Sequence, residues 1–410
     1  MPEHKITEFF NIYIESFLKR KTIIKNPLYL SDIWIPEQIK HRDRELSLIF
    51  QYIAPIIKRF KAPNLLLYGP TGTGKTLSVK YLGKQLDNLS TIKKLLIKHV
   101  YVNCRIYGNK SSSPYYILRD ILSQLTKKVI KDGIKTTDLI NELFSYIQEK
   151  DISVLIIFDE IDSLIKNTKE DDFLYLITRD DHVLDRNRLS FIGISNTLDY
   201  LKDLDARTLS SLNAIKIGFK PYNALQLYDI LKERACLAFE EGVVSDDILR
   251  YIAAWVARES GDARKAISIL RLAGNLADAE SSDRVTMKHV ERAIEGYDLD
   301  SFISEVETLS THHKLIVLSI LEEQIKLDDH SFVSFTEIYE RYTQLCSEYG
   351  LRPLSKDSIG KKIKQLETFL GDYMEVYIKS FGKYGRKKVV RINLDKEKAY
   401  KVIKFLRDNI

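Results

Sequence analysis

The chain has 410 residues, 44% of them hydrophobic and 29% charged, so it is long enough for about two to four domains and too apolar to be disordered along most of its length. Its net charge of +6 is too small for a histone-like wrapping protein but is compatible with one basic face. Three scattered cysteines argue against a disulfide framework or zinc module, and no apolar run approaches the roughly 18 residues that span a bilayer, so we expect a soluble cytoplasmic protein.

The first 28 residues carry an amphipathic pattern of aromatic and aliphatic side chains. These side chains recur at helical spacing: Ile6, Phe9, Phe10, Tyr13, Phe17 and Leu18. Apolar stripes usually pack onto a neighbouring core. We therefore expect an N-terminal helical segment, residues 1–28, that packs on the domain after it, with partner binding as the alternative.

Residues 29–220 alternate short apolar runs with amphipathic helical stretches. The apolar runs are residues 65–68, 100–102, 154–158 and 191–194. Continuous apolar strands separated by helices are typical of a parallel sheet that is buried on both faces. We predict an α/β fold here, with a parallel sheet and covering helices.

A phosphate-binding loop (P-loop) directly follows the first apolar run and precedes a helical segment. Its residues fit the pattern GxxxxGK[ST]: Gly69, Pro70, Thr71, Gly72, Thr73, Gly74, Lys75 and Thr76. The glycines allow backbone N–H groups to turn toward phosphate oxygens, and the helix N-terminus adds positive potential. Lys75 would reach the β- and γ-phosphates and Thr76 would hold Mg²⁺. The sequence therefore predicts a nucleotide site.

Two later strands end in polar residues that suit the same site. Asp159 and Glu160 follow the run 154–158. Asp159 would be the metal-side carboxylate, and Glu160 would polarise the attacking water. Asn196 follows the run 191–194 and would bring an amide near the γ-phosphate. Helix capping is the alternative role for the carboxylates, and an ordinary turn is the alternative for Asn196; the P-loop upstream favours the catalytic interpretation of the carboxylates.

Helical periodicity replaces the strands from residue 221 to about residue 298, for example at Ile248, Ile252 and Val256. This pattern predicts a smaller helical domain over residues 221–298. Further helices then precede two alternating strands, 374–379 and 388–392, joined by a glycine-rich segment. A hairpin after helices outlines a winged helix, which we predict for residues 299–410.

The predicted winged helix carries the basic excess of the chain. Between residues 351 and 392 there are 11 basic and 4 acidic residues. Ser355 fits the N-cap of a helix whose apolar face is formed by Ile359, Ile363, Leu366 and Leu370. The side chains expected to contact DNA lie off that face and on the hairpin: Ser355, Lys356, Ser358, Lys361, Lys362, Lys383, Tyr384, Gly385, Arg386, Lys387 and Lys388. A narrow basic hairpin tip can enter a minor groove; a solvated basic face without a ligand is the alternative.

Together these motifs resemble an AAA+ ATPase, and more narrowly the archaeal origin-recognition initiator family, relatives of the eukaryotic origin recognition and cell-division-cycle loader proteins. The segments that carry the resemblance are Pro36-Glu37, His41-Arg42-Asp43-Arg44-Glu45, Phe158-Asp159-Glu160-Ile161-Asp162, Gly193-Ile194-Ser195-Asn196, Asp205-Ala206-Arg207, Pro221-Tyr222, Gly261-Asp262-Ala263-Arg264 and the C-terminal wing. Phe158 departs from the aliphatic residue that is more usual there, but it keeps the strand apolar.

The resemblance implies further site residues. Asn196 would be the sensor-1 residue, Arg264 the sensor-2 residue that couples phosphate occupancy to the lid angle, and Arg207 an arginine that faces a neighbouring subunit's nucleotide. A surface position is the alternative for Arg264. The remaining implied contacts are to nucleotide, from Tyr222, Arg234 and the stretch 33–42 with His41 and Arg42, and to DNA, from Lys110 in the stretch 105–116, which could equally be a plain loop.

The resemblance also implies the activity and the partners. We expect an AAA+ base (29–220), a helical lid with sensor 2 (221–298) and a DNA-binding winged helix (299–410). The chain would be an ATP-dependent replication initiator, a slow ATPase that uses ATP, ADP and Mg²⁺ as a switch. It would bind double-stranded origin DNA, help load the replicative helicase and associate with paralogous initiators, in the cytoplasm at the nucleoid.

Two other functions compete with this expectation. One is a signal-transduction P-loop ATPase whose winged helix regulates transcription; Arg264 on a lid directly after the core, and a chain that ends at the wing, favour the initiator. The other is a nonspecific structural DNA-binding protein, which would leave the P-loop idle and would not co-purify with nucleotide.

Overall fold

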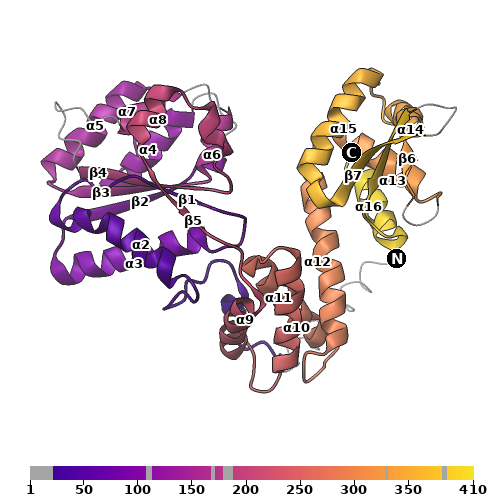
Figure 1. Ribbon diagram of the computed structural model, residues 1–410, viewed down its shortest axis with the longest axis horizontal. Coiled ribbons are helices and arrows are strands. Elements are labelled where there is room, and N and C mark those ends of the chain that lie inside the picture. Colours follow the sequence, from indigo (N-terminus) through magenta and orange to yellow (C-terminus); the bar gives the residue numbers. More distant parts are fainter. Residues whose placement is uncertain (1–21, 108–112, 168–170, 179–187, 328–330, 381–385) are drawn as a thin grey trace, which may run out of the picture. The chain divides into compact units, whose positions relative to one another are not determined.

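The structure of the chain is a computed structural model that describes residues 22–107, 113–167, 171–178, 188–327, 331–380 and 386–410 (Figure 1). It divides into two compact units, Met1–Val290 and Glu291–Ile410. The division falls within helix α12 (Met287–Glu307), which also runs through the expected boundary at residue 298. No helix among the described residues is both long enough and apolar enough to cross a membrane.

A parallel sheet forms the centre of the first unit. In the described part of this unit, the strands lie in the order β2-β3-β4-β1-β5 and all their pairings are parallel. Their bounds are Leu65–Tyr68 (β1), Ile97–Asn103 (β2), Ser153–Asp159 (β3), Leu189–Ser195 (β4) and Ile215–Gly218 (β5). The predicted parallel sheet is confirmed, and β3 and β4 are buried over their whole length, as continuous apolar runs require.

Helices cover both faces of this sheet (Figure 1). On one face lie α2 (Asp43–Ile53), the short turn η2 (Ala54–Lys58) and α3 (Lys75–Lys93). The other face is covered by α4 (Ser113–Thr126), α5 (Thr136–Glu149), α6 (Ile161–Asn167), α7 (Asp171–Thr178) and α8 (Ala206–Leu212). Because side chains alternate along a strand, Ile156 and Phe158 of β3 enter one core and Leu155 and Ile157 enter the other.

Three helices follow the last strand of the sheet: α9 (Ala224–Ala238), α10 (Asp246–Glu259) and α11 (Ala263–Ala279). Each begins at a side-chain N-cap, provided by Asn223, Ser245 and Asp262, which satisfies amide groups that the first turn leaves without a partner. We refer to these helices as the lid.

The described part of the N-terminal segment packs on the lid. The turn η1 (Pro27–Leu30) contacts α9 and α11, and Asp278 of α11 accepts hydrogen bonds from Thr22 and from the backbone N–H of Ile23. The predicted amphipathic stripe of residues 6–18 lies outside the described residues.

The second unit has the winged-helix arrangement that the sequence predicts. Helices α13 (Thr311–Gln324), α14 (Phe335–Glu348) and α15 (Lys356–Leu370) pack with an antiparallel sheet of the described strands in the order β6-β8-β7, and α16 (Lys396–Asp408) follows. The strands are β6 (Val333–Ser334), β7 (Met374–Ser380) and β8 (Arg386–Ile392). The two hairpin strands, β7 and β8, are where the alternating pattern predicts them; β6 was not predicted, because two residues carry no periodicity.

Candidate functional site

The P-loop joins β1 to α3 and is held closely by the lid. Gly72 has a φ of +65°, and a Cβ there would lie 1.7 Å from Asp262 Oδ1; the carbonyl of Gly72 accepts a hydrogen bond from the N–H of Ala263 at 3.2 Å. Gly74, with a φ of +88°, is the N-cap of α3 and has room for no side chain beside the Tyr222 hydroxyl. Only glycine fits both positions, so the loop and the N-terminus of α11 are in direct contact.

Lys75 lies beneath this loop and is 6% exposed. Its Nζ donates hydrogen bonds to the carbonyls of Gly69 at 2.6 Å and Pro70 at 2.7 Å, and to Asn196 Oδ1 at 3.3 Å. Burial, and next the positive charge of Arg264, lower the pKa of Lys75 to about 8. Two of the residues that the sequence assigned to one phosphate, Lys75 and Asn196, are therefore in contact, and the charge of the third, Arg264, acts on Lys75.

The Asp159 carboxylate lies beside Thr76 at the end of β3. Thr76 Oγ1 donates to Asp159 Oδ2 at 3.0 Å, and Tyr101 OH donates to the same oxygen at 2.5 Å. A hydroxyl and a carboxylate are the hard oxygen ligands that Mg²⁺ takes together with phosphate oxygens. The chemistry of this pair therefore fits the metal ion that the P-loop implies.

Glu160 follows Asp159 in a left-handed backbone conformation, with a φ of +55°. Its carboxylate is half-buried, and burial raises its pKa, while Arg105, whose Nε lies 3.8 Å from Glu160 Oε2, opposes that rise. A half-buried carboxylate of raised pKa suits a group that accepts a proton from water.

A cavity of about 340 Å³ is lined by residues of the P-loop, of the ends of β2 and β3, of the lid and of the segment before α2, whereas Lys75 and Asn196 are not among its lining residues. The expected site residues that line it are Gly72, Gly74, Thr76, Asp159, Glu160, Tyr222, Arg234 and Arg264. Several of its other lining residues were not singled out from the sequence, among them Lys80, Tyr101 and Asn103. Two of these belong to an apolar strand, where the sequence pattern indicates only core packing.

One end of the cavity is built around Arg234 of α9, which is buried. Its guanidinium donates to the carbonyls of Tyr29 at 2.7 Å and Ser31 at 3.1 Å, and its Cζ lies 4.3 Å from the centre of the Trp34 ring. Burial lowers the pKa of Arg234 to about 10. Trp34 and Ile35 both line the cavity, so the stretch 33–42 contributes to its wall as expected.

His41 and Arg42, at the end of that stretch, are not among the residues that line the cavity. His41 Nε2 lies 2.9 Å from Asp229 Oδ2. Arg42 is 3% exposed and donates to the carbonyls of Thr73 at 2.9 Å and Lys220 at 2.7 Å, and to the Tyr222 hydroxyl at 3.1 Å. Arg42 thus ties the P-loop to the segment that leads into the lid, and its predicted contact with nucleotide stays a prediction.

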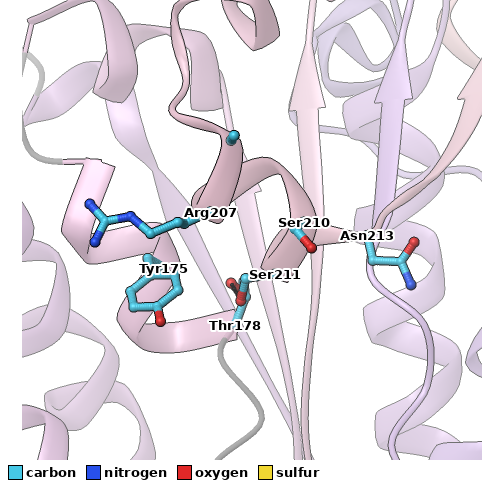
Figure 2. Close-up of a pocket in the computed structure, with 7 residues that line it drawn as sticks. Tyr175, Thr178, Arg207, Ser210, Ser211 and Asn213 are labelled. Carbon is cyan, nitrogen blue, oxygen red and sulfur yellow. Dashed lines mark hydrogen bonds between the residues drawn. The ribbon is translucent and has the colours of Figure 1, made fainter.

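Arg207 is placed apart from the nucleotide cavity. It lines a separate open cavity of about 560 Å³ between α7 and α8, together with Tyr175, Thr178 and Ser211 (Figure 2). Its side chain is exposed, and its Nη2 lies 3.7 Å from Asp205 Oδ2. This position leaves the expected role of Arg207 toward a neighbouring subunit as a prediction.

A basic cavity of about 690 Å³ lies in the second unit, where α14 begins and α15 and β8 pass beside it. Its lysines are Lys356, Lys361, Lys364 and Lys388. The predicted helix geometry is confirmed: Ser355 caps α15, and Ile359, Ile363, Leu366 and Leu370 are buried. Lys356 and Lys361 are therefore exposed on the outer face of α15, while Lys362 is half-buried and Ser358 donates its N–H to Ser355.

Several residues that are predicted to contact DNA lie outside the described residues or at the start of β8. Lys110, Lys383, Tyr384 and Gly385 lie outside the described residues, and Arg386 and Lys387 are described only as backbone of β8. Their contacts with DNA stay predictions.

Three family models match successive parts of the chain. They are an AAA domain over residues 58–199, a Cdc6 AAA+ ATPase-type lid domain over residues 228–295, and a CDC6 C-terminal winged helix domain over residues 304–402. Each match falls on the corresponding part of the structure.

Relatives match over nearly the full length. The chain is 35% identical to ORC1-type DNA replication protein 1 of Sulfurisphaera tokodaii over 95% of both chains, and 34% identical to the protein of that name from Archaeoglobus fulgidus over 96% of this chain and 93% of that one. Among solved structures, the Aeropyrum pernix ORC1 protein in complex with DNA has a TM-score of 0.79 and 32% identity, covering 94% of this chain and 98% of that chain.

Proposed function

Because the chain belongs to the ORC1-type family of AAA+ DNA replication proteins, we propose that it is a replication initiator. It binds double-stranded origin DNA under the control of bound ATP or ADP. The observation that carries the proposal is the nucleotide cavity, in which groups from the P-loop, from the end of β3 and from the lid meet. The DNA complex of the Aeropyrum pernix relative supports the choice of ligand.

We propose the following division of work at the nucleotide. The P-loop amides and Lys75 bind the phosphates, and Thr76 with Asp159 holds Mg²⁺, which would neutralise charge on the β- and γ-oxygens. Glu160 orients and deprotonates the attacking water, and Asn196 contacts the γ-phosphate. Tyr222 and Arg234 form the wall around the rest of the nucleotide. The loop around the phosphates is completed by Gly69, Pro70, Thr71 and Thr73.

Hydrolysis serves as a switch in this proposal. The γ-phosphate is the part of ATP that ADP lacks, and Arg264 on α11 would contact it from the lid. The hydrogen bond from Ala263 to Gly72 supports this coupling, because a movement of α11 must change a P-loop contact. Loss of the γ-phosphate then releases the lid. The protein therefore needs to hydrolyse only one ATP, slowly, each time it switches.

DNA is bound by the second unit. The proposed contacts are Lys356, Lys361 and Lys388 at the basic cavity, with Ser355, Ser358 and Lys362 along α15 and the hairpin residues 383–387 in the adjacent groove. Four lysines around one cavity support phosphate binding. We also propose that Lys110 adds a contact from the first unit, and that Arg207 reaches the nucleotide of an adjacent paralogous subunit.

The remaining expectations are part of the same proposal. The chain is divided into an N-terminal segment (1–28), an AAA+ base (29–220), a lid (221–298) and a winged helix (299–410). It acts at the nucleoid, in the cytoplasm, and helps to place the replicative helicase on the DNA that it marks.

Nuclease footprinting of the purified protein across the candidate origins of its host chromosome tests this proposal. We expect discrete protected sites whose extent differs between ATP and ADP. Protection that is spread evenly along the DNA with both nucleotides would contradict the proposal that the protein is an initiator. It would indicate a nonspecific DNA-binding ATPase instead.

A further inference from the structure

The hydroxyl of Tyr101 holds the carboxylate at the end of β3. Tyr101 OH and Thr76 Oγ1 both donate to Asp159 Oδ2, at 2.5 Å and 3.0 Å. The other oxygen, Oδ1, accepts from the backbone N–H of Glu160 at 3.1 Å. The carboxylate is therefore fixed through both of its oxygens, and the Tyr101 hydroxyl makes the shortest of these contacts.

The pairing of two strands explains why Tyr101 reaches this carboxylate. In the parallel pair β2·β3, Tyr101 lies opposite Ile157, two residues before Asp159. Its neighbours Val100 and Val102 point into the core beneath α4 and α5, so alternation turns Tyr101 to the opposite face, toward α3. Tyr101 packs there against the core that contains Ile157, and its hydroxyl extends to the end of β3, where α3 begins with Lys75 and Thr76.

We propose that Tyr101 is a positioning residue for metal-dependent nucleotide binding, acting through Asp159. The inference rests on the proposed nucleotide site and adds a residue to it. A carboxylate that is already fixed in one rotamer loses less freedom when it takes up an ion. Partners that orient metal-binding groups are typically worth about ten- to a hundredfold in metal affinity. Tyr101 would lower the concentration of Mg²⁺ that the site needs, without touching the nucleotide's phosphates.

The test removes one oxygen atom. Tyr101→Phe keeps the ring and its packing against the α3 side of the sheet but deletes the hydrogen bond to Asp159. Binding of N-methylanthraniloyl-ATP is followed by fluorescence in EDTA and across a Mg²⁺ titration. We expect the variant to need about tenfold more Mg²⁺ for half-maximal enhancement of binding, while its affinity in EDTA equals that of the unmodified protein.

A matched control is available in the same unit. Tyr200 is also buried, and its hydroxyl has no hydrogen-bond partner among the described residues. Tyr200→Phe should therefore leave the Mg²⁺ requirement unchanged. A Mg²⁺ requirement that rises equally in both variants would overturn the proposal, because it would indicate a general effect of removing a buried hydroxyl.

A double-mutant cycle with Asp159→Asn tests whether Tyr101 acts through the carboxylate. We expect Tyr101→Phe to add little further loss in the Asp159→Asn background; a full additional loss would overturn the inference. An unchanged Mg²⁺ requirement in Tyr101→Phe, or an equal loss of affinity in EDTA, would overturn it as well. If the unmodified protein bound no nucleotide, or bound it without response to Mg²⁺, the proposed function itself would fail with it.

Discussion

Lys75 is a buried ammonium whose partners are two P-loop carbonyls and the Asn196 amide. Burial is the main cause that lowers its pKa to about 8, and Arg264 adds to the effect. Phosphate oxygens bind the charged form. Because the pKa is lowered, that form predominates below about pH 8 and is lost as the pH rises above it.

Lys75→Ala should weaken ATP binding by about tenfold or more, since the variant cannot make the charge-assisted hydrogen bond to phosphate. For the unmodified protein, affinity should stay level up to pH of about 8 and fall at higher pH. The variant should show no such fall. Isothermal titration calorimetry at pH values below and above this pKa measures the ATP affinity of the variant and of the unmodified protein. Equal affinities and parallel pH profiles would remove Lys75 from the site.

Arg42 shows a different role for a buried charge. Its guanidinium lies 3.8 Å from the centre of the Tyr222 ring and donates to carbonyls of the P-loop and of residue Lys220. Removing the side chain would delete both of these hydrogen bonds. Arg42 therefore supports the site without lining it.

Arg42→Ala should destabilise the first unit by about 2–4 kcal/mol, because it removes a buried hydrogen-bond network. Arg44→Ala, at an exposed position in the first turn of α2, is the control and should change stability by less than about 0.5 kcal/mol. Urea unfolding followed by circular dichroism compares them. Equal midpoints for the two variants would show that the buried network contributes nothing.

The residues of the site differ in how far the sequence could predict them. The P-loop, Asp159 and Glu160 follow from local order along the chain, because strand, loop and helix are adjacent. Tyr101 lies in an apolar run and is indistinguishable from a core residue until β2 is paired with β3. The contacts of Arg42 come from residues 178 and 180 positions further along the chain, and no local pattern encodes them.

At the scale of elements, long apolar strands and well-capped helices were predictable, whereas short edge strands were not. β3 and β4 carry continuous apolar runs that only a doubly covered sheet can bury. β5 is a four-residue strand that pairs with β1, and β6 has two residues. Tertiary pairing, not local pattern, creates such strands.

The family comparisons also leave the signal-transduction ATPase without support.

The helix α15 presents Lys356, Lys361 and Lys364 to the basic cavity, which leads to a prediction about the salt dependence of DNA binding. Lys356→Ala combined with Lys361→Ala should reduce the slope of log affinity for duplex DNA against log salt by about 0.9 for each phosphate that the variant no longer neutralises. Lys404→Ala, on the exposed face of α16 and away from the cavity, is the control. Fluorescence anisotropy with a labelled duplex measures the slopes; a slope unchanged by the double substitution would remove α15 from the interface.

In the whole molecule, the nucleotide cavity belongs to the first unit and the basic cavity to the second. Within the first unit, α11 contacts the P-loop through Ala263 and Asp262. The adjacent Arg264 lines the cavity. In the proposed switch, the coupling therefore begins at the N-terminus of α11.

Arg264→Ala should remove the difference between the ATP and ADP forms of the protein. Small-angle X-ray scattering of the unmodified protein should give distinct profiles with the two nucleotides, and the variant should give one profile with both. Identical profiles for the unmodified protein in ATP and ADP would contradict the lid switch.

We propose that the bound nucleotide controls how the protein binds origin DNA. The most direct test of this proposal is the affinity of the purified protein for an origin duplex and for a shuffled duplex of equal length, each with ATP and with ADP, at one salt concentration. We expect a preference for the origin duplex on the order of 10³-fold, and we expect its size to differ between ATP and ADP. Equal affinity for both duplexes with either nucleotide would contradict it.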